Sequence, residues 1–166
     1  MELYTNIKYS RRMMMRKFEI VKDEFIKYDN KDIKLPVRAT KHSVCYDFYS
    51  PIEYILKSGE TKLIFTNVKA TFGTDEGLIL ASTSGLGKKG IILANGIGII
   101  ESDYYGNESN DGNLGFMLHN LSEEDYSIAV GDKIGQGYFM KFLTVDDEEE
   151  ITTIRKGGFG STNKNA

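Results

Sequence analysis

The chain has 166 residues and a formal net charge of −3, a length that fits one domain with a substantial core. The small negative charge argues against direct nucleic-acid binding, and no apolar run approaches the about 18 residues of a membrane-spanning helix. Its single cysteine, Cys45, excludes an internal disulfide. We therefore expect an intracellular, cytoplasmic protein.

The chain begins with the basic stretch RRMMMRK (11–17), which lacks the apolar segment of a signal peptide. We interpret residues 1–16 as an N-terminal extension that is either frayed or contacts a protein partner. A β domain is expected over 17–154, followed by a flexible glycine-rich segment over 155–166.

Short segments rich in β-branched and aromatic residues fill the rest of the chain, and turn-forming residues separate them. In chain order they are FEIV (18–21), SVCYDFYS (43–50), TKLIFTNVKATF (61–72), LILAS (78–82), GIILA (90–94), GFMLH (115–119), YSIAV (126–130), KIGQGYFMKF (133–142) and ITTIR (151–155). In the longer segments apolar residues recur at every second position, which is typical of a half-buried strand.

No segment carries the apolar stripe of an amphipathic helix, apart from a short turn near 122–125. The acidic run DDEEE (146–150) is expected to be a solvated loop. Many short strands at close spacing predict an all-β fold, either a sandwich, a jelly roll or a barrel.

Three groups of polar residues are candidates for a metal-binding or anion-binding site. His42 and His119 have no partner at metal-ligand spacing, so structural roles are favoured over zinc. The segment GLGKKG (85–90) is not a phosphate-binding loop of the GxxxxGK[ST] type and by itself predicts a turn. The segment RKGGFGSTNK (155–164) combines cations, accessible backbone N–H groups and hydroxyls, so a plain tail and an anion-binding site stay equally open.

The stretch GIIESDYYGN (98–107) passes from apolar to acidic to aromatic residues. Two interpretations fit a carboxylate at the end of a strand beside two tyrosines. It is either a solvated turn or a carboxylate held next to a ring-shaped ligand.

Five segments together resemble, in order and spacing, the five motifs of the trimeric dUTPases, the deoxyuridine triphosphate nucleotidohydrolases. They are LPVRATKHSVCYDFYS (35–50), STSGLGKKG (82–90), NGIGIIESDYYG (95–106), GDKIGQG (131–137) and RKGGFGST (155–162). The resemblance implies a jelly roll that assembles as a homotrimer, with each site built from neighbouring subunits. It also implies hydrolysis of dUTP to dUMP and pyrophosphate by attack of water on the α-phosphorus.

The same resemblance implies roles for individual residues. Asn95 and backbone groups would read the uracil, Tyr104 would pack on the deoxyribose, and Glu101 would orient the attacking water. The glycine-rich end would close as a lid, and Mg²⁺ would be held by the triphosphate and water rather than by protein ligands. The implied catalytic residues are Glu101 and Asp47, and the implied substrate-binding residues are Ser84, Gly85, Asn95, Gly98, Tyr104, Gln136, Arg155, Phe159, Gly160, Ser161 and Thr162.

Two residues depart from the family pattern. Glu101 stands where the family has aspartate, which displaces the carboxylate, and Thr83 stands where it has arginine. Loss of a hydrogen bond to a charged group costs roughly 1.5–3 kcal/mol, so these departures predict reduced activity. They keep an alternative open, in which the chain binds the nucleotide with little hydrolysis and acts as a sensor, a sponge or a protein-binding regulator.

Overall fold

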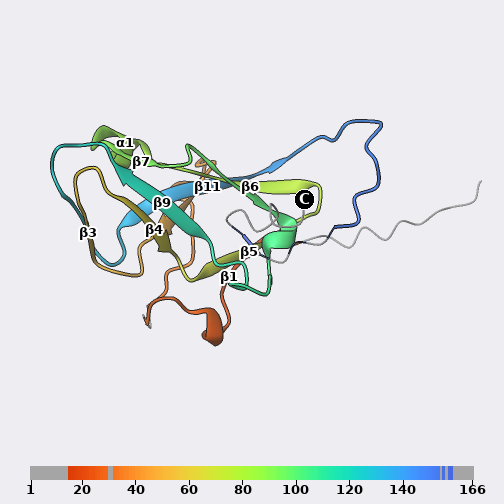
Figure 1. Ribbon diagram of the computed structural model, residues 1–166, viewed down its shortest axis with the longest axis horizontal. Helices are drawn as coiled ribbons and strands as arrows, with labels where there is room; N and C mark the ends of the chain where they lie inside the picture. The colour runs from red at the N-terminus through yellow and green to blue at the C-terminus, as the bar shows by residue number, and fades with distance from the viewer. Residues whose placement is uncertain (1–14, 30–31, 154, 156, 159–166) are drawn as a thin grey trace, which may run out of the picture.

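A computed structural model describes residues 15–29, 32–153, 155 and 157–158 (Figure 1). The predicted all-β architecture is confirmed, because the helical elements are one short α-helix and two 3₁₀ turns among these residues. In chain order the elements are β1 Lys17–Ile20, η1 Asp23–Phe25, β2 Tyr46–Tyr49, β3 Tyr54–Leu56, β4 Thr61–Phe65, β5 Val68–Thr71, β6 Glu76–Ala81, α1 Ser84–Lys88, β7 Ile91–Leu93, β8 Gly98–Glu101, η2 Ser102–Tyr104, β9 Gly115–Asn120, β10 Tyr126–Ile128 and β11 Lys133–Lys141.

Two antiparallel sheets form the body of the molecule. One has the order β2-β11-β6-β8 and the other the order β4-β9-β7, and Figure 1 shows β9 crossing in front of β11. Alternate residues of β6 and of β9 are buried, so each sheet turns one apolar face inward. The sheets meet where the rings of Phe48 and Phe116 lie 5.2 Å apart between centroids.

Close approach of the sheets requires a glycine at position 135. A Cβ on Gly135 would lie 2.0 Å from Cε1 of Phe116, so no larger residue fits without moving the sheet. The core around this contact contains the fully buried side chains of Leu78, Leu80 and Leu118. The sandwich is therefore closed by side-chain packing across β11 and β9.

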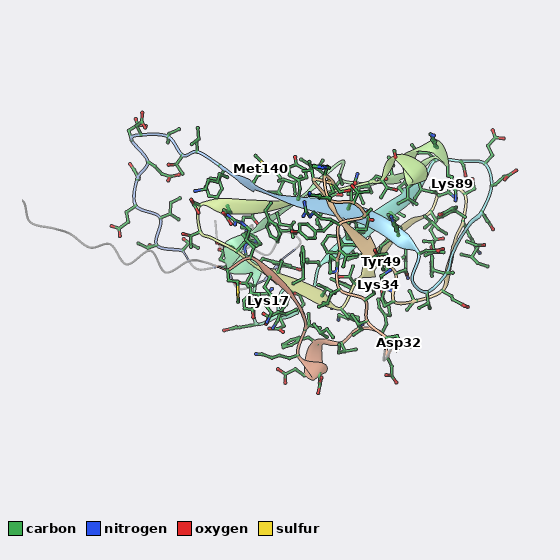
Figure 2. All side chains as sticks on the ribbon, turned by 180° about the vertical axis from the view of Figure 1, so that it is seen from behind. Lys17, Asp32, Lys34, Tyr49, Lys89 and Met140 are labelled. Atoms are coloured by element: carbon green, nitrogen blue, oxygen red, sulfur yellow. The ribbon has the colours of Figure 1, made fainter. Side chains whose placement is uncertain are left out.

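Two smaller sheets and a cation–π contact fasten the ends and loops. Strand β1 pairs with β5, and β10 pairs with β3. Just before β1, the guanidinium of Arg16 forms an ion pair with the buried carboxylate of Glu76. The loop that precedes β2 is held by Lys34, whose Nζ lies 3.7 Å from the ring centroid of Tyr49 (Figure 2).

Several predicted elements differ in the structure. The segment 61–72 was expected to be one strand but divides into β4 and β5, because Asn67 has a positive φ of 60°. The predicted strand 151–155 is wrong, since residues 151–153 and 155 have no regular structure and residue 154 lies outside the described part. Strand β3 was missed, and so was α1, whose sequence SGLGK has poor helix propensity.

The remaining predictions on loops have mixed outcomes. Residues 122–124 form bends and not a helical turn. The acidic run 146–150 is exposed as expected, within the long connection that follows β11 and extends away from the sheets (Figure 1). None of the helices in the described part of the chain has the length and apolar character that crossing a membrane requires.

Candidate active site

A cavity of about 180 Å³ collects residues from one end of the four-stranded sheet and from the C-terminal segment. Residues from two of the five motifs line it, although the first of them, Asn95, and the last, Gly158, are 63 positions apart. The predicted site residues on its wall are Asn95, Gly98, Glu101, Tyr104 and Arg155.

The turn that carries Asn95 joins two different sheets. Strand β7 pairs with β9, while β8 pairs with β6. The chain reverses through Gly96, whose φ is +74°, and the Gly96 amide donates to the Leu93 carbonyl at 2.9 Å. Because the two arms belong to separate sheets, they diverge and leave the backbone of the turn accessible beside the cavity.

Glu101 is the last residue of β8 and directly precedes η2, so the strand ends at the predicted carboxylate. Its side chain is 53% exposed, and its Oε2 lies 3.1 Å from a guanidinium nitrogen of Arg155. The Nε of Arg155 donates to Asp103 Oδ1 at 2.9 Å. One arginine from the C-terminal segment therefore joins two carboxylates that flank the end of β8.

Tyr104 forms a fixed wall of the same cavity. Its side chain is buried, its hydroxyl donates to the carbonyl of Asn113 at 3.0 Å, and the amide of Asn110 donates to this hydroxyl at 2.6 Å. Burial raises the pKa of the Tyr104 phenol, so the ring stays neutral. A Cβ on Gly158 would lie 2.5 Å from Cε2 of Tyr104, so the backbone of the C-terminal segment rests directly against the ring.

Asp47 and Gln136 lie side by side on β2 and β11, as the strand register pairs them. Asp47 is buried, and its Oδ2 lies 2.6 Å from the Nζ of Lys133 in an ion pair. This close contact with a carboxylate raises the pKa of Lys133. The Gln136 amide donates to the Ser82 carbonyl at 2.9 Å, which ties β11 to the segment that leads into α1.

Ser84 and Gly85 are exposed at the start of α1. The preceding residue, Thr83, caps the helix, because its Oγ1 accepts from the Leu86 amide at 3.2 Å. Thr83 and Gly85 line a second cavity, of about 280 Å³, whose other lining residues are Leu86, Lys89, Tyr126, Asp132 and Lys133. The position where the family pattern has arginine thus has a structural role in this chain.

The structure separates the predicted residues into two groups. Glu101 pairs with Gly77 on β6, whereas Gln136 pairs with Ala81 at the other end of that strand. Four residues along a strand span about 13 Å. The two cavities share no lining residue, and Gln136 lines neither of them. By the strand register, Glu101 and Gln136 therefore lie at different places within one chain.

Four predicted residues, Phe159, Gly160, Ser161 and Thr162, lie outside the described residues. The structure also adds residues that sequence reasoning missed as site components. Lys133 neutralises Asp47, Asp103 shares Arg155 with Glu101, and Asn110 holds the Tyr104 hydroxyl. The asparagine-rich run NESNDGN (107–113), which begins three residues after Tyr104, is the signal in the sequence for such support.

Comparisons with known proteins identify the family. The dUTPase family model matches residues 31–163. Over 152 residues the chain is 40% identical to the deoxyuridine 5'-triphosphate nucleotidohydrolase of Lactococcus lactis subsp. lactis, which spans 90% of this chain and 99% of that protein. The protein of the same name from Hydrogenovibrio crunogenus is 37% identical over 142 residues, or 80% of this chain and 88% of the relative.

The fold agrees with this assignment. The crystal structure of dUTPase from Streptococcus mutans superposes with a TM-score of 0.68 at 32% identity, over 78% of this chain and 98% of that one. The predicted jelly-roll class is thereby confirmed. The chain belongs to the dUTPase family.

Proposed function

We propose that the protein hydrolyses dUTP to dUMP and pyrophosphate by attack of water on the α-phosphorus. The observation that carries this proposal is the cavity in which Asn95, Glu101, Tyr104 and Arg155 meet. These residues supply an amide for a base edge, a carboxylate for a water molecule, a ring for a sugar and a cation for a phosphate. Relatives at 40% and 37% identity carry the name of the same activity.

Each step of the reaction has a residue in this proposal. Asn95 and the backbone near Gly98 receive the uracil at the open turn, and Tyr104 packs on the deoxyribose. Glu101, half exposed at the mouth of the cavity, orients a water molecule and takes its proton as a general base. Positioning of this kind, and not covalent chemistry, contributes most of the rate in phosphoryl transfer.

The phosphates are assigned to the second group of residues. The Ser84 hydroxyl and the Gly85 amide, exposed at the start of α1, contact phosphate oxygens together with Gln136. Gly85 and Lys133 line the second cavity, where Lys133 adds a positive charge. Asp47 would then hold Lys133 in place from β2, since their side-chain atoms lie 2.6 Å apart.

Mg²⁺ fits this arrangement as an ion held by the triphosphate and by water. The described residues contain no group of three His, Cys, Asp or Glu side chains that could hold a metal. In this proposal the phosphates provide the oxygen ligands that Mg²⁺ prefers. When bound, the ion would neutralise charge on the phosphates. The chain's own part is to hold the phosphates through Ser84, Gly85 and Gln136.

The C-terminal segment is proposed to act as a lid. Arg155 would leave Glu101 and Asp103 for the γ-phosphate, and Phe159 would cover the uracil. Gly160, Ser161 and Thr162 would add backbone and hydroxyl donors to the phosphates. A closed lid excludes water other than the nucleophile and completes the set of contacts.

We also propose that the protein is a homotrimer with sites shared between subunits. The separation of Glu101 from Gln136 within one chain supports this, because a second copy could bring the two groups together. Exposed apolar side chains support it as well: Ile99 and Phe142 are 60% and 48% exposed, and with Met140 they line a hollow of about 210 Å³. Figure 2 shows Met140 on β11, far from Lys89 at the α1 end.

Light scattering in dilute buffer tests the assembly. The expected mass is three times that of the 18.7 kDa chain. A single-chain mass at micromolar concentration would exclude the trimer and, with it, the shared site.

Two further roles belong to the proposal. The protein would act inside the cell, in keeping with its single cysteine. A protein partner would bind the N-terminal extension, of which residues 1–14 lie outside the described part.

The deciding assay is pyrophosphate release with Mg²⁺ from dUTP, measured beside dTTP, dCTP and UTP. Release from dUTP alone supports the hydrolase. Tight dUTP binding by calorimetry without release would contradict it and favour the regulatory binder.

A further inference from the structure

The loop that follows Tyr104 is built from buried side-chain amides. Asn107, Asn110 and Asn113 are 6%, 7% and 0% exposed, which is unusual for a polar loop because buried amides must find hydrogen-bond partners. Two of these side-chain amides bond to Tyr104. Asn110 donates to the Tyr104 hydroxyl, and Asn107 donates to the Tyr104 carbonyl at 2.7 Å. The Tyr104 hydroxyl in turn donates to the backbone carbonyl of Asn113.

Asn110 is itself held on both sides. Its Oδ1 accepts from the Asn107 amide at 2.7 Å and from the Gly112 backbone at 3.0 Å, while its Nδ2 reaches the phenol at 2.6 Å. The side chain can therefore not rotate without losing three hydrogen bonds. A Cβ on Gly112 would lie 2.8 Å from the Tyr104 carbonyl oxygen, so the loop lies directly against the tyrosine backbone as well.

A buried ion pair between Asp111 and Lys69 of β5 holds the loop in place. Asp111 has a positive φ of 57° and is 1% exposed. Its Oδ2 accepts from the Nζ of Lys69 at 2.6 Å and from the backbone amide of Lys22 at 2.9 Å. This anchor fixes the residue next to Asn110, so the amide that holds Tyr104 is supported by β5 and by the segment after β1.

These contacts decide which part of Tyr104 is available to a ligand. The hydroxyl donates one hydrogen bond and accepts one, both within the protein, so the ring surface is what it presents to the cavity. The position of that ring is set by the hydroxyl's partners. Any shift of the Tyr104 ring would therefore change its contacts with a sugar packed on it.

We propose that Asn110 is a positioning residue that holds the Tyr104 ring against the sugar subsite and thereby sets the preference for 2'-deoxyribose over ribose. This inference rests on the proposed function. A ribonucleotide adds one hydroxyl at the sugar, and a wall that cannot retreat excludes it. Without the Asn110 amide, the ring gains freedom to move away, and a misplacement of about 1 Å is enough to change rates on the order of 10²-fold.

The test is a double-mutant cycle read as a ratio. We would measure kcat/KM for dUTP and for UTP in the parent, Asn110→Ala, Tyr104→Phe and the double variant. Asn110→Ala should lower the dUTP-to-UTP ratio about tenfold, the equivalent of one hydrogen bond of about 1.4 kcal/mol. In the Tyr104→Phe background the same change should have little further effect, because the two residues act through one contact.

Ser109→Ala is the matched control, since Ser109 is exposed in the same loop and bonds only to Asn107 in the described contacts. It should leave the ratio unchanged. Should Asn110→Ala unfold, Asn110→Asp keeps the shape and the acceptor for Gly112 but loses the amide donor, and the ratio should still fall.

A ratio that stays constant in Asn110→Ala, or that falls equally in both backgrounds, overturns the inference. Turnover of dUTP by the parent separately reports on the proposed function. Where the parent shows no turnover, the ratio of calorimetric affinities for dUMP and UMP replaces the ratio of kcat/KM values. The role of Asn110 is therefore tested in either case.

Discussion

A guanidinium nitrogen of Arg155 lies 3.1 Å from the Glu101 carboxylate, so the cation proposed for the γ-phosphate is paired with the carboxylate proposed to activate water. Both residues belong to the same chain. Because the Glu101 and Asp103 side chains are each 53% exposed, such pairs contribute little, typically 0–1 kcal/mol. A triphosphate can therefore draw Arg155 away at small cost and free Glu101 at the same moment.

The first prediction concerns Glu101. Glu101→Gln should abolish dUTP hydrolysis while dUTP still binds, because an amide cannot take the proton of water. Glu101→Asp should raise turnover, since the shorter acid restores the geometry of the family pattern. Single-turnover hydrolysis checks both. Hydrolysis by Glu101→Gln at the parent rate would remove Glu101 from the mechanism.

The second prediction concerns the C-terminal segment. Truncation after Ile154 should leave the fold intact, since a glycine-rich terminus buries little surface. The affinity for dUTP should fall more than the affinity for dUMP, which lacks the β- and γ-phosphates. Calorimetry on both proteins measures this.

Arg155→Ala in the full-length chain separates the contribution of the Arg155 charge to dUTP affinity from that of the rest of the C-terminal segment. It should reproduce most of the loss in dUTP affinity, with Arg155→Lys as the variant that keeps the charge but not the planar fork. Equal dUTP affinity in the truncated and full-length proteins would mean that the segment is not a lid.

The third prediction concerns Thr83. Thr83→Arg should strengthen contacts to the phosphates in the transition state and raise kcat/KM. It should also lower stability by about 0.5–2 kcal/mol, because the helix cap on the Leu86 amide is lost. Thr83→Ser keeps the cap and should change neither quantity. Urea unfolding and steady-state kinetics distinguish the two effects, and a Thr83→Arg protein of unchanged stability would argue against the capping role.

The fourth prediction concerns the buried pair of Asp111 and Lys69. Their side chains are 1% and 9% exposed, so Asp111→Asn leaves a buried ammonium without its counter-charge and should cost about 3–5 kcal/mol. Asp75→Asn is the matched control, because the Asp75–Lys141 pair is 62% and 69% exposed and should contribute about 0–1 kcal/mol. Equal losses in urea unfolding would contradict the buried pair's importance.

The same pair predicts a dependence on pH. Burial raises the pKa of Asp111, but hydrogen bonds from Lys69 and from the Lys22 amide outweigh it, and the pKa lies below its usual range. The stability that Asp111 contributes is therefore complete above the ordinary aspartate pKa of about 3.9 and is lost as the pH falls through the lower folded-state pKa. The difference between parent and Asp111→Asn should shrink below about pH 4.

Much of the fold could be predicted from the sequence because strand patterns are local. Short runs of β-branched and aromatic residues between turn-forming residues favour strands whatever their partners are, as in the segments that became β6 and β11. The predictions failed where distant contacts override the local pattern. Asn67 interrupts the strand predicted over 61–72, because its backbone amide donates to Asn113 Oδ1 at 2.9 Å and its side chain accepts from the Lys27 amide.

The sequence by itself determined the family motifs and hence the identities of the proposed site residues. It also predicted that a strand ends at a carboxylate, since the apolar residues Ile99 and Ile100 are followed directly by Glu101. Only the tertiary structure decided which of these residues meet. Arg155 joins Glu101 from 54 positions away, Gln136 lies at the other end of β6, and buried amides hold Tyr104. Strand order and loop packing depend on contacts between residues far apart in the chain, which no local pattern records.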